Sequence, residues 1–408
     1  MKSPIPVFED LTQMDTYDLV TYLPDQTYLP DYIKALNFLK AYNGSQGTFN
    51  AYRREVERLL HWCTLVAQKS LQEVKREDIE SFIEFCQKPP TAWIGVNRLS
   101  RFITIDGMRL PNPKWRPFVV TIPKAAYQAG ERPNPKDFEL SQSAIKDMFA
   151  ILGSFFTFLL QEEYVFVNPV ALIRQKSKFI RTAQNKPKIR RLSDRQWSYV
   201  IATAQEMATV NPTLHERTLF MMSTLYSMYL RISELGASKR WSPAMNHFFK
   251  DSDENWWFTT VGKGNKQRQI AVSDTMIEAL KRWRLYLGLS PLPSRADQSP
   301  LITKLQGFGA ITNTTYLRRV IQTCFDQTIA KLNQDGYEED ADSLKEATVH
   351  WLRHTGISDD VKHRPREHVR DDAGHGSGTI TDKYIDVDLK ERHKSAKHKL
   401  IHEDNGLS

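Results

Sequence analysis

Four short patterns in the second half of the chain carry the residue types that chemistry on a phosphodiester needs. They supply, in this order, Arg231, Lys263, His350, Arg353, His375 and Tyr384. Two guanidinium groups can fork onto the nonbridging oxygens of one phosphate, and histidines can add hydrogen bonds. A tyrosine can then attack the phosphorus while a lysine or a histidine protonates the departing oxygen. This order predicts covalent attack on a phosphodiester without a metal ion.

Arg231 stands out because its surroundings are apolar. It lies near the end of the segment LFMMSTLYSMYLRISEL, where an unpaired charge would be costly. Glu234 follows three residues later, on the same face of a helix, and is the predicted partner that supports the guanidinium. An ion pair with a purely structural role is the alternative for this segment.

Each of the other patterns also has an ordinary interpretation when it is taken alone. Lys263 in VGKGNKQRQIAV could be an exposed turn lysine, and His350 and Tyr384 could be packing residues. His350 and His354 have the i, i+4 spacing of zinc ligands, but Trp351 stands where a zinc protease needs glutamate. The sequence therefore predicts no metal site and no cofactor.

The elements that must position these residues are mainly helices. Helical spacing of apolar residues predicts a small helical domain over 31–173. From residue 192 helices dominate again, interrupted by WWFTTVGKGNKQRQIAV, which predicts a β-hairpin turning at Gly264 and Asn265. The apolar faces of the first domain comprise Tyr52, Val56, Leu59, Leu60 and Cys63, then Ile79, Phe82, Ile83 and Cys86, and finally Ile145, Met148, Phe149, Leu152, Phe155, Phe156 and Leu159.

Three other stretches differ in composition from these domains. Residues 1–30 form a leader with one basic residue and five acids, better suited to packing or a protein partner than to phosphates. Prolines and tryptophans break helical periodicity over about 89–135, which predicts an insertion. The segment 174–191 holds eight lysines or arginines and no acid, and predicts a flexible basic linker between the domains. Its candidate phosphate-binding residues are Arg181, Lys186, Lys188, Arg190 and Arg191.

Length indicates more than one domain, and net charge weakly favours a polyanionic partner such as nucleic acid. The chain has 408 residues, 40% hydrophobic and 25% charged, with a formal net charge of +8. Its three cysteines, Cys63, Cys86 and Cys324, are far apart, which indicates neither a disulfide framework nor a zinc site. No signal-peptide core is evident, and we expect that no stretch approaches the roughly 20 apolar residues of a membrane helix. We therefore expect a cytoplasmic, nucleoid-associated protein without a membrane partner.

The order of the six residues strongly resembles the tyrosine recombinase, or phage integrase, family. The strings LRISEL at 230–235, GKGNKQR at 262–268 and LRHT at 352–355 resemble it too, as does the Gly-His pair before the tyrosine. The match covers about 192–390, and 143–169 resembles the end of the family's helical DNA-binding domain. It is closer to Xer-like or transposon-type enzymes, because the acidic leader does not resemble the basic arm-site domain of some phage integrases.

The resemblance implies a mainly α fold with a small β-hairpin or sheet, arranged as a two-domain, C-shaped clamp around DNA. It implies a catalytic domain over 192–390 and a C-terminal tail over 391–408, with 386–408 as the candidate for exchange between protomers. Arg231 and Arg353 would bind the scissile phosphate, Lys263 would be the general acid, His350 and His375 would assist, and Tyr384 would be the nucleophile. Strand exchange would pass through a 3′-phosphotyrosine and a Holliday junction, in a tetramer on double-stranded DNA. A second recombinase or an accessory factor is a further possible partner.

Two departures from the family pattern leave other functions open. The stretch GASKRWSPAMNHFF lacks the family's usual run after LRISEL, and the 89–135 insertion is not typical. A type IB topoisomerase shares much of the chemistry but relaxes DNA without joining two sites. A catalytically silent or accessory DNA-binding protein of the same fold is the other alternative, although it would need none of the six residues in order.

Overall fold

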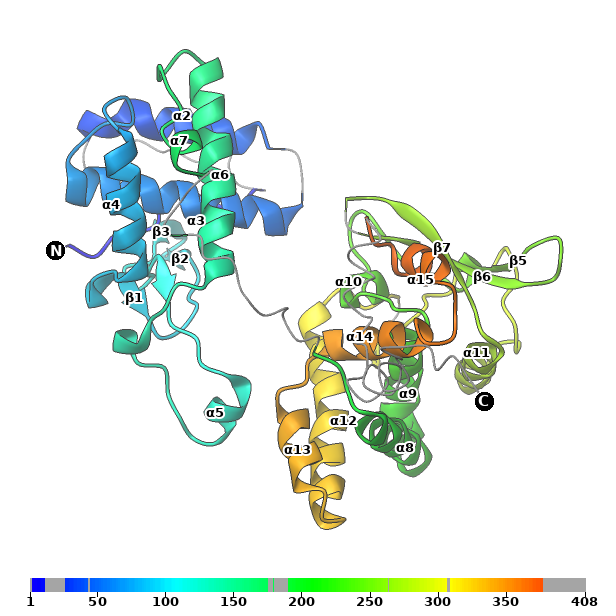
Figure 1. The fold of residues 1–408 in the computed structure, drawn as a ribbon. Helices are drawn as coiled ribbons and strands as arrows, with labels where there is room; N and C mark the ends of the chain where they lie inside the picture. The colour runs from blue at the N-terminus through cyan, green and yellow to red at the C-terminus, as the bar shows by residue number, and fades with distance from the viewer. Residues whose placement is uncertain are drawn as a thin grey trace, which may run out of the picture. The chain divides into compact units, whose positions relative to one another are not determined.

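A computed structural model describes residues 2–11, 26–42, 45–174, 179, 190–262, 264–306 and 309–376. The chain divides into two compact units, Met1–Lys186 and Pro187–Ser408. Each unit has its own hydrophobic core. Figure 1 shows helices in both units, and the second unit contains a three-stranded sheet. The described part is therefore mainly α with small sheets, as the sequence predicted.

The first unit is built from helices joined by an irregular segment with short strands. Serine side chains accept hydrogen bonds at two helix starts: Ser45 accepts from the Thr48 amide and Ser141 from the Ala144 amide, each at 3.2 Å. A π-helical turn follows directly after the second long helix. The helices are η1 (Gln26–Tyr28), α2 (Leu29–Lys40), α3 (Gln46–Trp62), η2 (Cys63–Ala67), α4 (Arg76–Gln87), η3 (Thr91–Trp93), α5 (Lys124–Gln128), η4 (Pro135–Asp137), α6 (Gln142–Gln161) and α7 (Ala171–Arg174).

α6 provides one side of this core. The seven apolar residues predicted to share a face, from Ile145 to Leu159, are all buried there. α6 is also long and apolar enough to cross a membrane by length and composition, so the expectation that no stretch reaches that size was wrong. Its apolar character has a simpler cause, because these buried side chains pack in the core of the unit.

α3 carries an unusual number of buried charges, and neighbouring segments neutralise them. Glu57 accepts the backbone amide of Val7 at 2.6 Å and forms an ion pair with Arg101. Arg58 donates to the carbonyl of Pro117 and pairs with Glu55 at 3.0 Å. These partners come from the leader and from the 89–135 segment, so both are bound to α3.

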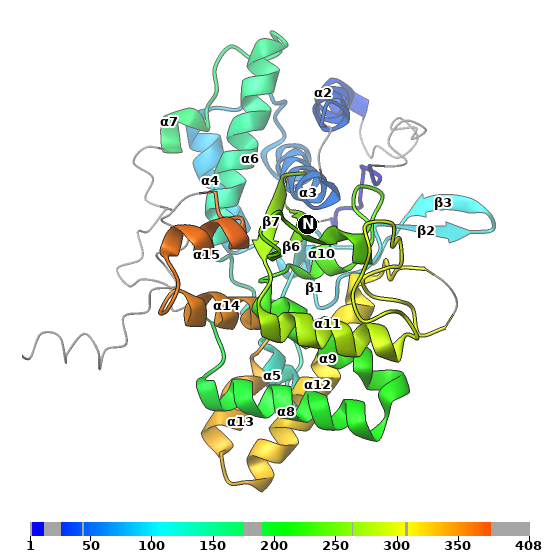
Figure 2. The ribbon, with the colours of Figure 1, turned by 90° about the vertical axis from the view of Figure 1, so that its right-hand side faces the viewer.

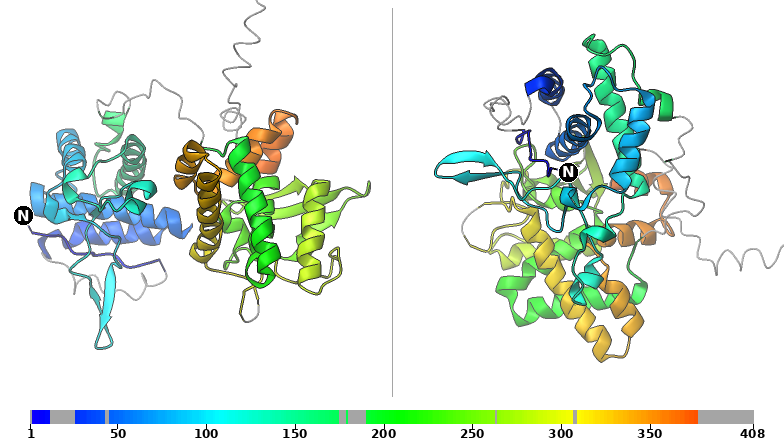
Figure 3. Two further views of the ribbon diagram at one scale, coloured as in Figure 1. Left: turned by 90° about the horizontal axis from the view of Figure 1, so that it is seen from below. Right: turned by 90° about the vertical axis from the view of Figure 1, so that its left-hand side faces the viewer.

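The 89–135 segment contains two pairs of short strands in place of long helices. β1 (Ile94–Gly95) pairs in parallel with β4 (Phe118–Val119), and β2 (Phe102–Ile105) pairs antiparallel with β3 (Met108–Pro111). The β2–β3 hairpin projects from the unit (Figures 2 and 3). Its turn residues, Asp106 and Gly107, both have positive φ, so the sequence Ile-Asp-Gly-Met was a hairpin signal that the sequence analysis missed.

The second unit combines a helical core with one small antiparallel sheet. The strands β5 (Phe248–Lys250), β6 (Trp256–Val261) and β7 (Gln267–Ala271) lie in that order. β6 and β7 form the predicted hairpin, and Gly264 and Asn265 in its turn both have positive φ. The helices are α8 (Asp194–Val210), α9 (Pro212–Ser227), α10 (Ile232–Leu235), η5 (Met245–His247), α11 (Asp274–Tyr286), α12 (Thr314–Gln334), α13 (Glu338–Lys345), α14 (Val349–Asp360) and α15 (Arg366–Ala373).

Two contacts in this unit position the candidate site. α14 packs against α9, and α15 packs against β7 (Figure 1). Leu192, the first buried residue after the basic segment, donates its amide to the Thr355 hydroxyl of α14 at 3.0 Å. α14 is thus fixed on one side by α9 and at its middle by the chain that enters the unit.

Candidate active site

Arg231 lies at the start of a short helix, where its own backbone and side chain both contact one carboxylate. It is the residue before α10, and Glu234 is in the first turn of that helix. The Arg231 amide donates to Glu234 Oε2 and the guanidinium Nη1 to Oε1, both at 2.9 Å. Glu234 is buried, whereas about a quarter of the Arg231 side chain is exposed. The predicted ion pair is present, and it leaves Arg231 partly accessible to a ligand.

A second arginine, Arg268 of β7, binds the same carboxylate. Its Nη1 lies 3.0 Å from Glu234 Oε1 and its Nη2 lies 2.8 Å from Oε2. Its Nε donates to the backbone carbonyl of Asp372 at 2.9 Å. The string GKGNKQR contains this arginine, but its partner lies 34 residues away in sequence, so no local spacing pointed to the contact.

Arg353 is buried in α14 and is held by backbone carbonyls. Its guanidinium donates to the carbonyl of Tyr229 and, at 2.6 Å, to that of Ala373. The same Nη2 lies 3.3 Å from Nε2 of His375. Arg353 therefore connects the turn before Arg231 to the end of α15, and it places His375 next to a fixed positive charge.

Three histidines gather around these arginines. His350 and Arg353 both lie on α14, and His350 is the most exposed of the three histidines. Reduced hydration, followed by the charges of Arg353, Arg318 and Arg231, lowers the pKa of His350. The pKa values of His354 and His375 fall to about 4, again mainly because their rings are partly buried. Both imidazoles are therefore neutral at pH 7.

The charges that act on these histidines show which groups the fold brings together. Arg353, Arg231, His354 and Arg268 all lower the pKa of His375, in that order after burial. Arg231 and Arg353 belong to segments more than a hundred residues apart, yet both act on His350 and on His375. The structure thus assembles four of the six predicted residues, Arg231, His350, Arg353 and His375, into one positively charged cluster.

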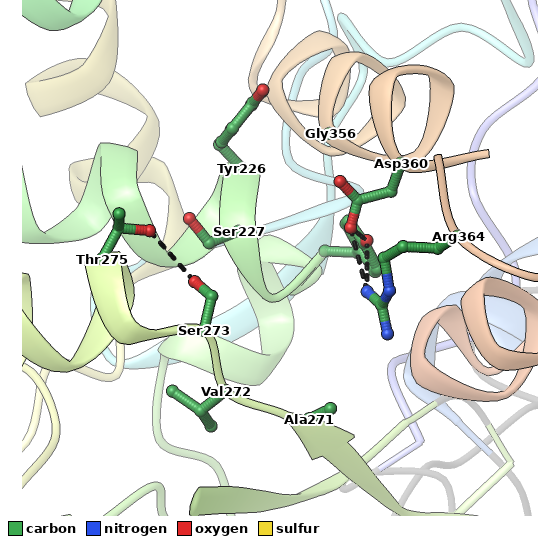
Figure 4. Close-up of a pocket in the computed structure, with 10 residues that line it drawn as sticks. Tyr226, Ser227, Ala271, Val272, Ser273, Thr275, Gly356, Asp360 and Arg364 are labelled. Carbon is green, nitrogen blue, oxygen red and sulfur yellow. Dashed lines mark hydrogen bonds and ion pairs between the residues drawn. The ribbon is translucent and has the colours of Figure 1, made fainter. Parts of the chain in front are cut away.

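A second polar network links α14 and α15 and contacts β7. The Tyr229 hydroxyl donates to Asp360, and Arg364 donates to Asp360 at 2.9 Å and to Asp372 at 2.6 Å. Asp372 also accepts the Ala271 amide of β7 at 3.2 Å. Figure 4 shows Asp360 and Arg364 across a pocket of about 430 Å³ from Ser273 and Thr275. Tyr229, whose carbonyl binds Arg353, is therefore held at its backbone and at its side-chain hydroxyl.

Two glycines are required by close packing in the site. A Cβ on Gly262 would lie 2.9 Å from Arg268 Nη1 and 3.3 Å from Arg231 Nη1. Gly374 has a φ of +63°, and a Cβ there would lie 2.7 Å from Arg268 Cδ. Glycine thus lets the β6–β7 turn and the end of α15 approach the arginines closely.

Several predicted residues cannot be placed. Lys263 and Tyr384 lie outside the described residues, as do Arg181, Lys186 and Lys188 and the 391–408 tail. Of the basic segment, Arg190 is exposed, and Arg191 lies 3.9 Å from Asp359. Among the residues that the structure describes, no group of three or more potential metal ligands is present.

The cluster provides hydrogen-bond donors and positive charges that can stabilise an anionic centre. Two guanidiniums are held in place by buried carboxylate and carbonyl groups, and neutral imidazoles can donate hydrogen bonds. Such donors bind a phosphate with no need for a metal to supply positive charge. The described residues are therefore suited to bind one phosphodiester.

Comparison with known proteins gives a consistent result. No family model matches the chain. The tyrosine recombinase XerC of Thermodesulfovibrio yellowstonii is 24% identical over 254 residues, which cover 61% of this chain and 73% of that protein. The XerH site-specific recombinase in a post-cleavage complex with its difH substrate superposes with a TM-score of 0.55 at 15% identity, over 98% of this chain and 99% of that one.

A transposon enzyme has a similar fold. The Tn1549 integrase bound to a circular intermediate DNA gives a TM-score of 0.51 at 16% identity, over 89% of this chain and 98% of that one. These structural likenesses concern the fold, and the sequence likeness to XerC agrees with them. The chain is thus similar to a tyrosine recombinase in sequence and to site-specific recombinases and integrases in fold.

Proposed function

We propose that the protein is a site-specific DNA recombinase that cuts and rejoins DNA through a 3′-phosphotyrosine intermediate. The observation that supports this best is the cluster of Arg231, Arg353 and His375, with buried groups fixing both arginines. Tyr384 follows His375 by nine residues, within reach of the cluster by chain length. XerC, XerH and the Tn1549 integrase are recombinases or integrases by name, which agrees with this activity.

In the proposed cleavage step, the Tyr384 oxygen attacks the phosphorus and the bond from phosphorus to the 5′ oxygen breaks. Lys263 gives a proton to the departing 5′ oxygen, and the phenol proton passes to a nearby base or to water. The energy of the phosphodiester bond is retained in the phosphotyrosine ester, so rejoining needs no ATP. A 5′ hydroxyl from a second strand then attacks that ester, and releases the tyrosine.

In this mechanism, Arg231 and Arg353 neutralise the two nonbridging oxygens as charge builds up in the pentacoordinate transition state. His350 and His375 assist by hydrogen bonding. Burial and then the charges of both arginines keep the pKa values of these histidines low, so the His375 ring is neutral before DNA binds. A bound phosphate would partly cancel the arginine charges and raise those pKa values, which favours donation to the phosphate oxygens.

The proposed partner is double-stranded DNA carrying a recombination site. We infer that the two units enclose the duplex, that the basic residues from Arg181 to Arg191 contact its phosphates, and that four protomers join two sites through a Holliday junction. The same proposal locates the protein with the DNA in the cytoplasm. A second recombinase or an accessory factor is a possible further partner.

The test uses DNA duplexes that carry a nick beside the cleavage position, so that the cut fragment diffuses away and the covalent complex accumulates. Wild-type protein is incubated with a library of such duplexes, and adducts that resist SDS are isolated and sequenced. Tyr384→Phe should form none. Tyr286→Phe, which changes a partly exposed tyrosine of α11 elsewhere in the same unit, should form as much as wild type.

The position of the label identifies the bond. A 3′-phosphotyrosine retains a label at the 5′ end of the cut strand and loses a label at its 3′ end. Exchange between two differently labelled sites would distinguish a recombinase from a type IB topoisomerase, which would relax supercoiled DNA without exchange. Binding without any adduct would favour a catalytically silent DNA-binding protein.

A further inference from the structure

Arg268 of β7 connects the Arg231–Glu234 pair to the end of α15 beside His375. One edge of its guanidinium binds Glu234, the partner of Arg231, and its Nε binds the Asp372 carbonyl, three residues before His375. We propose that Arg268 is a positioning residue that fixes Arg231 and His375 in the geometry that cleavage requires. This inference rests on the proposed function, and it adds Arg268 to the six residues predicted from the sequence.

The contact with Glu234 is the first step. Glu234 is buried and accepts four hydrogen bonds, two from Arg231 and two from Arg268. Burial raises the pKa of Glu234, but the hydrogen bonds and the charge of Arg268 outweigh burial and keep that pKa below its ordinary value. Without Arg268, Arg231 would be the one remaining charged partner of the carboxylate among the described residues, and the carboxylate would pull that partly exposed guanidinium inward.

The contact with α15 is the second step. Asp372 is in the last turn of α15, and its carbonyl would be a free acceptor at the helix end if Arg268 did not bind it. Gly374 then turns the chain with positive φ while packing against the aliphatic part of Arg268. His375 follows Gly374 directly, so the position of His375 depends on the Arg268 side chain.

The third step concerns the β6–β7 turn. Gly262, at the start of the turn, packs against the Arg268 and Arg231 guanidiniums, and its amide donates to the Lys266 carbonyl at 2.8 Å. Arg268 lies just beyond the same turn. Movement of Arg268 would therefore also move the turn that contains Lys263.

The primary test replaces Arg268 with methionine, which keeps much of the side-chain length but removes the charge. Single-turnover cleavage of the nicked site should fall about 100-fold, because small displacements of catalytic groups cost about that much. Affinity for the uncut site should change less than about threefold, since Arg268 is nearly buried and paired within the protein. Arg268→Lys should restore part of the rate, because a lysine can contact Glu234 but cannot fork onto it.

A matched control removes a similar ion pair away from the cluster. Arg282 of α11 also forks onto a carboxylate, that of Glu216, at 2.6 and 3.0 Å. Arg282→Met should therefore cleave as wild type. If Arg268→Met proves unfolded by circular dichroism, Gly262→Ala takes its place, because the added methyl crowds the same contact without removing a charge. It should lower cleavage and leave DNA affinity unchanged.

A double-mutant cycle separates positioning from an independent effect. If Arg268 acts through Arg231, then Arg268→Met should cost less than about threefold in cleavage when added to Arg231→Lys, because residues that act as a unit are not additive. Full multiplication of the two losses would overturn the inference, as would a wild-type cleavage rate in Arg268→Met. The absence of an adduct with wild-type protein on every duplex would instead overturn the proposed function.

Discussion

Tyr229 lies two residues before Arg231, and its carbonyl accepts a hydrogen bond from the Arg353 guanidinium. Tyr229 has a φ of 49°, a left-handed conformation that is unusual for a residue other than glycine. Its hydroxyl donates to Asp360, at the end of α14. The strained residue, Tyr229, thus sets the spacing between Arg231 and Arg353. The contacts of its carbonyl and of its hydroxyl maintain the strained conformation.

The close approach of α14 to α9 gives a stability prediction. A Cβ on Gly356 would overlap the Tyr226 carbonyl oxygen and lie 3.2 Å from the Tyr229 ring. Gly356→Ala should therefore lower the free energy of unfolding by about 3 kcal/mol, the upper part of the usual range for overpacking. Urea denaturation would measure this. Gly153→Ala in α6 is the control, since its nearest neighbour would be 3.9 Å away, and the change should stabilise the protein by up to about 1 kcal/mol.

Arg353 gives a prediction about catalysis. Lysine at this position cannot bind both the Tyr229 and Ala373 carbonyls and still present a fork to a phosphate. Arg353→Lys should slow single-turnover cleavage about 100- to 1,000-fold, as expected when one donor to the transition state is lost. Rates would come from adduct formation on the nicked site at saturating protein. Cleavage within threefold of wild type would show that Arg353 has only a structural role.

Local spacing in the sequence was sufficient for much of this arrangement. The i, i+3 interval predicted the Arg231–Glu234 pair, and helical periodicity predicted the buried face of α6. The partners of Arg268, Arg353 and Glu57 could not be predicted, because they lie 20 to 124 residues away and depend on how whole elements pack. For the same reason, the prolines of the 89–135 segment correctly excluded long helices but did not show that Arg101 neutralises Glu57 of α3.

Buried His61 of α3 predicts a pH dependence of stability. Burial is the main reason that its pKa falls to about 4; Glu57 opposes the shift and Arg101 adds to it. The folded pKa lies below the unfolded value of 6.5, so the unfolded chain binds more protons, and this contribution to stability is lost as pH falls below 6.5. Between pH 7.5 and 5 the loss should be about 2 kcal/mol.

His61→Phe is the appropriate comparison, because it keeps a ring beside Trp93 and Trp115 but cannot take up a proton. Urea denaturation at both pH values measures how much unfolding free energy each protein loses between pH 7.5 and 5. The loss should be smaller in His61→Phe than in wild type by about 2 kcal/mol. Equal losses in the two proteins would mean that His61 does not titrate in this range.

The basic segment gives a prediction about DNA binding that does not depend on catalysis. Residues 174–191 contain no acid, so we expect Arg181, Lys186 and Lys188 each to neutralise one phosphate. Every such contact releases counterions, and adds about 0.9 to the steepness of log affinity against log salt concentration. Replacing all three with alanine should flatten that slope by about 3 and weaken binding most at low salt.

Replacing Lys281, Lys345 and Lys362, which have acidic partners in the second unit, is the control of equal charge. Because these lysines are already paired, their loss should change the slope by less than about 1. Equal flattening by both sets would mean that net charge, and not contact by the basic segment, controls affinity.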